Sequence, residues 1–153
     1  MTSTKFSHQL TARRFSVIVG LAGVAAIHIM DLPGKFAETP YLAVAYLAMI
    51  AGAAFTIERL VKSARAVDFL AAAALAGSVF AGFVVNRTVG MPGAMGDIGN
   101  WLEPIGFLSL FVEAFVVWQA LAGFALLSRS KEIDLDDELQ QLTAKSDYVL
   151  SLG

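Results

Sequence analysis

The stretch Asn86–Glu113 reads NRTVGMPGAMGDIGNWLEPIGFLSLFVE and joins the last two of four apolar runs in the chain. It gathers glycine, proline, asparagine, aspartate and tryptophan into a connector of roughly sixteen residues, longer than the usual link between helices. It ends with a carboxylate, Glu113, inside a hydrophobic run. Because the other connectors are short, we expect the four runs to be membrane spans and the rest of the chain to be organised around this stretch.

The composition is that of a membrane protein. Hydrophobic residues make up 57% of the 153 residues, against roughly 45–50% in a soluble domain. The chain contains no cysteine, which excludes a disulfide framework and a thiolate metal site within it. Its net charge of −2 gives no electrostatic reason to expect nucleic-acid binding.

Each of the four apolar runs is long enough to cross a hydrocarbon core of about 30 Å as a helix. The runs show no alternating pattern, so helices are the remaining way to span a membrane. We therefore predict an all-α fold, an integral membrane four-helix bundle. The predicted spans are residues 15–32, 41–58, 67–86 and 104–127, between an N-terminal segment, residues 1–14, and an acidic tail, residues 128–153.

Proline marks the helix ends around the first connector. Pro33-Gly34 follows the first run and is expected to end its helix, because proline lacks the backbone N–H that a helix needs. Thr39 is the predicted N-cap of the second helix, with Pro40 at its first position. A basic segment before an apolar run also fits a signal peptide, but this run approaches spanning length and lacks a small-x-small cleavage site.

The basic residues near the spans are distributed unevenly between the two sides. Eight lie on the side of the termini and the second connector, whereas Lys35 and Arg87 lie on the other side. Basic residues collect on the cytoplasmic side, so we predict that both termini are cytoplasmic and that the long connector faces outward. The eight residues are Lys5, Arg13, Arg14, Arg59, Lys62, Arg65, Arg129 and Lys131.

Polar groups inside the predicted spans are the first candidates for function. Glu113 lies about nine residues into the last run, hence roughly 13 Å deep at 1.5 Å per residue. A charge at that depth is expensive, so the carboxyl group should be neutral or paired. Ser109 lies one turn outward on the same face, and Asn86 ends the third run. Glu113 is either a proton-accepting or ligand-binding carboxylate or a protonated acid that bonds to a neighbouring helix.

His28 lies near the outer end of the first run, and we expect it to bond to the outer connector or to take part in protonation. Ligation of haem by a histidine and a methionine, or of Cu(I) by thioethers, is chemically allowed. The spacing supports such a site poorly, because no paired histidine or M-x-x-M cluster accompanies it. We therefore predict no cofactor, with haem or copper as the alternative. The metal set in that alternative is His28, Met30, Met91 and Met95.

The outer connectors carry several acids and few bases. Arg87 is the base near most of them, so we predict that it pairs with Asp97, Glu103 or Asp31. Trp101 is expected to anchor at the membrane interface, where tryptophan is enriched. A connector of this length is more often functional or docked than free, and the simpler interpretation is a lid that closes the bundle.

Two surfaces are candidates for partners. Phe107, Phe111 and Phe115 form a bulky stripe on the last span that should face lipid or another subunit. In the acidic tail three leucines recur at helical spacing, which predicts a short amphipathic helix from about Asp134. Acidic helices are disfavoured on anionic lipid, so we expect this helix to dock on another polypeptide through Leu135, Leu139 and Leu142.

The motifs HIMDLPGKFAETPYL and RTVGMPG…DIGNWLEPIGFLSLFVE resemble a group of small four-span bacterial membrane proteins of uncharacterised function. The resemblance covers roughly residues 27–113 and excludes both tails. It implies a multi-pass protein of the bacterial inner membrane. It implies no activity, cofactor or substrate.

Three classes of function remain open at this point. The first, which is the one we predict, is a non-catalytic accessory or structural subunit of a larger membrane complex that docks through its helices and acidic tail. The Phe stripe and the acidic tail favour it. The second is a proton or small-ion pathway centred on Glu113, and the third is a haem- or metal-binding redox protein using His28. Nucleophilic enzyme chemistry has little support, because no serine, histidine and acid share an outer site.

Overall fold

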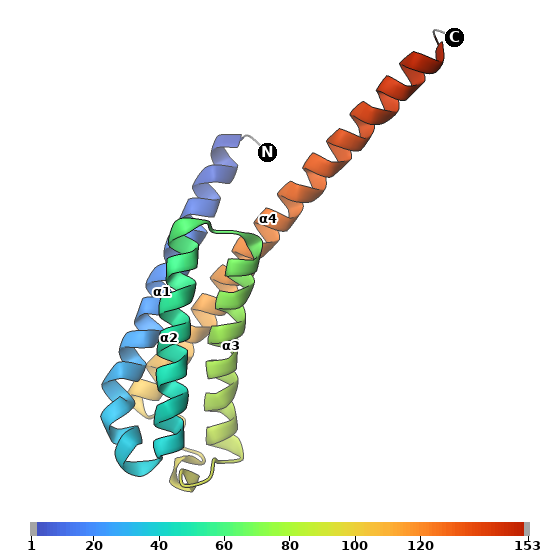
Figure 1. The fold of residues 1–153 in the computed structure, drawn as a ribbon. Coiled ribbons are helices and arrows are strands. Elements are labelled where there is room, and N and C mark those ends of the chain that lie inside the picture. Colours follow the sequence, from blue (N-terminus) through green and yellow to red (C-terminus); the bar gives the residue numbers. More distant parts are fainter. Residues whose placement is uncertain (1–2, 152–153) are drawn as a thin grey trace.

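Four long helices form an antiparallel bundle in the computed structural model, which describes residues 3–151 and their side chains except those at 3, 137, 144 and 146–151. Both ends of the described chain and the α2–α3 connector lie at one end of the bundle, the terminal end (Figure 1). The opposite end carries the α1–α2 and α3–α4 connectors and is called the connector end. The helices are α1 Ser3–Glu38, α2 Pro40–Lys62, α3 Ala66–Thr88 and α4 Pro104–Ser151, with a 3₁₀-helix η1, Met95–Asp97, in the last connector.

All four long helices contain a stretch long and apolar enough to cross a membrane. Within residues 3–151 the structure has no strand. The prediction of an all-α chain with four apolar helices is therefore confirmed, and it fits a multi-pass membrane protein.

Each helix packs against two neighbours in a ring, α1 on α2 and α4, and α3 on α2 and α4. The buried apolar core lies mainly in the middle and toward the terminal end of the bundle. Small residues on α3 allow the helix backbones to approach closely. In a membrane, where the hydrophobic effect does not drive helices together, such close packing is what stabilises their association. The core includes Val17, Leu21, Val24, Leu60, Phe69, Ala72, Ala76, Val116 and Ala120.

Two glycines set the closest helix contacts. A Cβ atom at Gly20 of α1 would lie 2.5 Å from Cγ2 of Val116 on α4. A Cβ atom at Gly123 of α4 would lie 2.5 Å from Cε1 of Phe69 on α3. No real side chain fits at such distances, so glycine at these positions lets α4 lie directly against α1 and α3.

The short α2–α3 connector is organised by Asp68, whose side chain is only 4% exposed. Its carboxylate accepts hydrogen bonds from the Arg65 backbone N–H at 2.8 Å, the Ser63 hydroxyl at 3.0 Å and the Arg59 Nε at 3.0 Å. The first of these caps the start of α3, where an acid is also favoured by the helix dipole. One buried carboxylate thus joins the end of α2 to the start of α3.

Asp68→Asn should lower the free energy of unfolding by roughly 2–3 kcal/mol, because the charge-assisted hydrogen bonds are lost while the site stays buried. The measurement is thermal or denaturant unfolding in a mild detergent. The matched control is Glu58→Gln, since Glu58 is an exposed carboxylate on the same connector side that pairs only with Lys62 one turn away. Equal losses for both variants would contradict this role of Asp68.

The prediction that α1 ends at Pro33-Gly34 is wrong, because α1 continues to Glu38. Proline removes only its own N–H, and later residues still donate. The Thr39 N–H, for example, reaches the Lys35 carbonyl at 2.9 Å. Thr39 does occupy the N-cap position of α2, with proline next to it, but its side chain makes no capping hydrogen bond.

The acidic tail is not a separate short helix. Residues 134–144 are helical, but they continue α4 without a break from Pro104 to Ser151. The reason is that the sequence after Leu127 contains neither glycine nor proline until the C-terminal residue, so nothing stops the helix when its apolar character ends. Every side chain described from Lys131 to Lys145 is exposed, and this part of α4 extends beyond the bundle (Figure 1).

Candidate functional site

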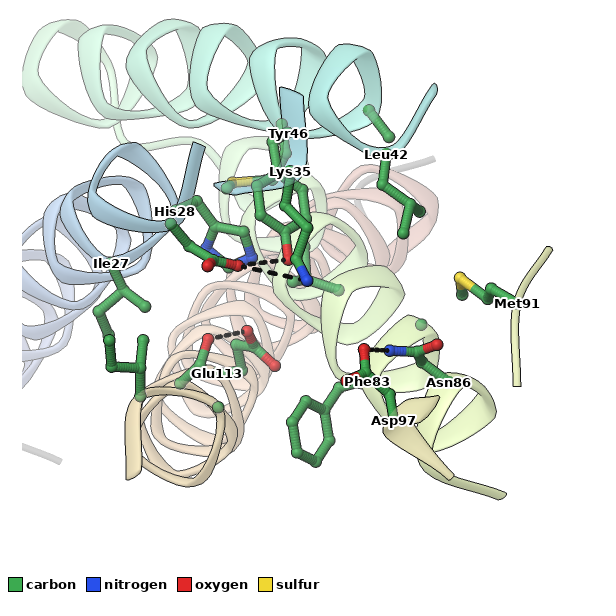
Figure 2. A pocket seen from close by; sticks show the side chains of 18 of the residues that line it. Ile27, His28, Lys35, Leu42, Tyr46, Phe83, Asn86, Met91, Asp97 and Glu113 are labelled. Atoms are coloured by element: carbon green, nitrogen blue, oxygen red, sulfur yellow. Dashed lines mark hydrogen bonds and ion pairs between the residues drawn. The ribbon is translucent and has the colours of Figure 1, made fainter. Parts of the chain in front are cut away.

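A cavity of about 370 Å³ with a mixed polar and apolar wall lies inside the bundle at the connector end. All four helices and the α3–α4 connector contribute to its wall, and Figure 2 shows polar side chains from several of these elements. Its volume lies within the range of roughly 300–1,000 Å³ that is typical of small-molecule pockets. The wall combines ionisable groups with apolar side chains such as Ile27, Leu42 and Phe83.

Glu113 is the most deeply buried acid of this cavity, with a side chain that is 1% exposed. The Ser109 hydroxyl, one turn earlier on α4, donates to its Oε1 at 2.5 Å (Figure 2). The spacing of these two residues on one helix face, expected from the sequence, is therefore present. The other carboxyl oxygen, Oε2, has no hydrogen-bond partner among the described residues.

His28 lies on the α1 wall of the cavity and bonds to its own helix, not to the outer connector as expected. Its Nδ1 lies 2.8 Å from the Val24 carbonyl oxygen. A carbonyl can only accept, so Nδ1 carries the hydrogen, and in the neutral ring Nε2 is then an acceptor. The ring stands edge-on to Tyr46 of α2, with 4.6 Å between the centroids.

The structure does not gather the methionines of the alternative metal set around His28. Met30 is 73% exposed on the outside of α1, and Met95 is also exposed, while Met91 lines the cavity. Among the residues that the structure describes, no group of three histidine, aspartate or glutamate side chains is placed to hold a metal ion.

Asp31 is held by two groups at the mouth of the cavity. The Tyr46 hydroxyl donates to its Oδ2 at 3.2 Å, and the Lys35 ammonium lies 4.0 Å from the same oxygen (Figure 2). Asp31 therefore pairs with Lys35 on its own helix, and not with Arg87, because the two α1 residues are one turn apart.

Arg87 forms the other two pairs that the sequence predicted. Its Nη1 lies 3.0 Å from Asp97 Oδ1 and its Nη2 lies 3.4 Å from Glu103 Oε2. The guanidinium stands 5.0 Å over the ring of Phe83, and the residue is only 6% exposed. A buried cation thus joins the end of α3 to the connector and to the start of α4.

The connector is held to the bundle by further bonds around this pair. The Asn86 side chain donates to Asp97 Oδ2 at 2.8 Å (Figure 2), and the Gly99 N–H donates to the Arg87 carbonyl at 2.9 Å. Glu103 also caps α4, accepting from the Gly106 N–H at 2.7 Å. The connector is therefore docked, as its length suggested.

Trp101 lies on the connector with its ring edge-on to Phe83, at a centroid distance of 6.1 Å. It remains partly exposed. Its role as an anchor at the membrane interface stays a prediction.

The ion pairs leave one acid of the cavity without a cation. Arg87 is shared by Asp97 and Glu103, and Lys35 is taken by Asp31. No ion pair involving Glu113 exists in the described part of the chain. Glu113 is therefore an acid of this wall with neither a cation nor a hydrogen-bond partner at Oε2 among the described residues.

Several site residues were not anticipated. Tyr46 was not singled out, although a hydroxyl in the middle of an apolar run is a signal that could have identified it. Lys35 was used only for orientation, and Phe83 had no sequence signal because aromatic residues are common in spans. Gln119, a polar residue within the last apolar run of the sequence, lies outside this cavity nearer the terminal end of α4 and accepts a hydrogen bond from Arg13 Nη1 at 2.6 Å.

No protein-family model, no curated protein and no solved structure matches this chain. The chemistry of the site is therefore argued from its own residues.

The docking of the connector should depend on pH through Asp97. Partial burial alone would raise the pKa of Asp97, but the hydrogen bond from Asn86 and the charges of Arg87 and Lys35 together lower it. An acid with a lowered pKa contributes stability that is present above its ordinary value of 3.8 and is lost as the pH falls through the lower folded value. The unfolding temperature should thus hold down to about pH 4 and then drop.

Asp97→Asn should lower the unfolding temperature at pH 7 and flatten the drop below about pH 4, measured by thermal unfolding in detergent from pH 7 to pH 3. Glu132→Gln serves as the control, because this carboxylate is exposed on the extended part of α4. If the unfolding temperature of Asp97→Asn falls below pH 4 as steeply as that of the wild type, the Arg87–Asp97 pair does not stabilise the connector.

Proposed function

We propose that the chain is a multi-pass protein of the bacterial inner membrane, with the connector end outside and both termini in the cytoplasm. Four apolar helices support the membrane assignment. The excess of basic residues at the terminal end supports the orientation. In this orientation the cavity faces outward.

The proposed function is a proton pathway in which Glu113 is the proton-accepting group. The observation that carries it is the free Oε2 of a carboxyl group that is almost completely buried, yet lines a cavity reaching the outer connector. Acids held inside membrane bundles next to such cavities are typical of proton relays. Ser109 orients the carboxyl group through its other oxygen.

Polar groups continue beyond Glu113 toward the cytoplasmic side. Gln119, also buried, lies six residues further along α4, hence about 9 Å away along the helix axis. It is bonded to Arg13 near the terminal end. Between them lies an apolar layer that includes Leu21 and Val116. In this proposal the apolar layer separates an outer and an inner half-path and limits the rate of transfer.

Glu113→Gln should reduce proton flux at least tenfold, because glutamine keeps the shape and can bond to Ser109 but cannot take up a proton. Flux is measured with a pH-sensitive dye trapped inside liposomes that contain the purified protein, after an acid step outside. Glu58→Gln, which removes an exposed acid elsewhere in the bundle, should leave the flux unchanged. Equal flux in wild-type and Glu113→Gln liposomes would refute the proposal.

A second candidate function is that of an accessory subunit in a larger membrane complex. The observation that favours it is the extension of α4 beyond the bundle, with Leu135, Leu139 and Leu142 all exposed along one stripe. The exposed Phe107, Phe111 and Phe115 on α4 would face lipid or the same partner. Acids surround the leucines, so the partner is proposed to be a polypeptide with an apolar stripe flanked by lysine or arginine.

Changing Leu135, Leu139 and Leu142 to serine should release the partner while the bundle still folds, since each buried leucine contributes roughly 1.5–3 kcal/mol. The measurement is mass spectrometry of the chains that co-purify in a mild detergent. A control with Gln140 and Gln141 changed to serine keeps the leucine stripe and should retain the partner. Full retention by the triple variant would exclude the tail as a docking element.

A further inference from the structure

Among the fully buried side-chain atoms of the cavity wall, acceptors without a hydrogen-bond partner outnumber donors. Glu113 Oε2 and Asn86 Oδ1 are buried and have no partner among the described residues. His28 adds an acceptor, Nε2, when its ring is neutral. The one buried donor atom of the wall in the same condition is Arg87 Nε. A ligand that fits this wall should therefore be mainly a hydrogen-bond donor.

The charges of the cavity favour a cation. Two bases, Lys35 and Arg87, face three acids with which they are already paired. Glu113 is the additional acid, and it is buried among apolar and neutral groups. When it is ionised, a positive ligand is the partner that would restore neutrality, since an isolated buried charge is strongly disfavoured.

The remaining wall is apolar. Ile27, Leu42, Met49, Val79 and Phe83 line the cavity beside the polar groups. At about 30 Å³ per water molecule, the cavity of about 370 Å³ has room for a molecule with a small ring or a branched chain. Such a body would displace water from apolar surface, which is favourable.

We infer that the cavity binds a small organic ammonium ion, with its apolar body against the aliphatic wall and its ammonium group against Glu113. The inference rests on the proposed function, because Glu113 must be able to lose its proton to bind the cation. The same oxygen cannot hold a proton and pair with an ammonium ion, so the two compete. Proton binding and ligand binding are thereby linked and opposite in sign.

Other ionisable groups around Glu113 define the pH range for a test. Histidine titrates near pH 6.5 in its ordinary state, and His28 faces the same cavity, so its contribution has to be separated from that of Glu113. The charged and titratable groups of the wall are His28, Asp31 and Lys35 from α1, Tyr46 from α2, Arg87 from α3, and Asp97 and Glu103 from the connector.

The test uses the purified full chain in detergent and two probes of the same shape, benzylamine and benzyl alcohol, with binding measured by calorimetry. The amine stays cationic between about pH 5 and pH 8, as lysine does. At pH 8 benzylamine should bind at least about tenfold more tightly than benzyl alcohol, the effect of one charge-assisted hydrogen bond. Its affinity should fall as the pH is lowered toward 5.

Variants identify the residue responsible for the preference for the amine and for its pH dependence. Glu113→Gln should remove the preference for the amine and its pH dependence, whereas Glu58→Gln should change neither. His28→Gln should keep the fall in affinity at low pH, because the competing proton is on Glu113. If His28→Gln instead abolishes that fall, the competing group is His28 and the inference is overturned.

The probe comparison in the wild-type protein decides the question even where a variant fails to fold. Equal affinities for amine and alcohol at pH 8, or no binding of either, would overturn the inference. If benzylamine binds equally well to Glu113→Gln and to the wild type, its binding is adventitious and does not involve Glu113. That result would also overturn the inference. Proton flux that still requires Glu113 in liposomes would then leave the proposed function standing while the ammonium site is rejected.

Discussion

The buried guanidinium of Arg87 is the interaction on which the connector end depends. It forms ion pairs with both Asp97 and Glu103, and the Arg87 backbone carbonyl accepts a hydrogen bond from the Gly99 N–H. The end of α3, the connector and the first turn of α4 are therefore fixed relative to one another by one side chain. Removing a buried cation would leave two acids close together in a partly dry site, which is a costly arrangement.

The two ends of the bundle are packed differently. Toward the terminal end, Gly20 and Gly123 bring the helices into direct contact and the interior is filled by aliphatic side chains and Phe69. Toward the connector end, polar residues of four helices replace that filling and leave a cavity. The change occurs within about one helical turn on α4, between Glu113 and Val116. A buried acid at this boundary is accessible to the cavity on one side and sealed on the other.

Much of the fold was predictable because membrane spans are recognised by length and hydropathy alone. The pairing of Arg87 with two acids was also predictable, since few bases lie near many acids at that end of the sequence. The bond between Ser109 and Glu113 followed from helical spacing on one element. In each case the relevant signal is local or is a matter of counting charges.

The remaining features depend on tertiary context that one sequence does not encode locally. Pro33 was expected to stop α1, but a helix near a span end tolerates the loss of one hydrogen bond. The partnership of Tyr46 with Asp31 joins two helices, and no spacing rule connects them. The capping of α3 by Asp68 combines groups from two helices and a turn. The cavity itself exists only once four helices are assembled.

The continuity of α4 has a mechanical consequence. Glu113 and the far end of α4 belong to one uninterrupted helix, and the 38 residue steps from Glu113 to Ser151 correspond to roughly 57 Å at 1.5 Å per residue. A tilt of about 5° at the level of Glu113 would displace the far end by roughly 5 Å over that length. A small rearrangement around the buried acid is thus magnified at the far end of α4, and a force on that end is transmitted to the acid.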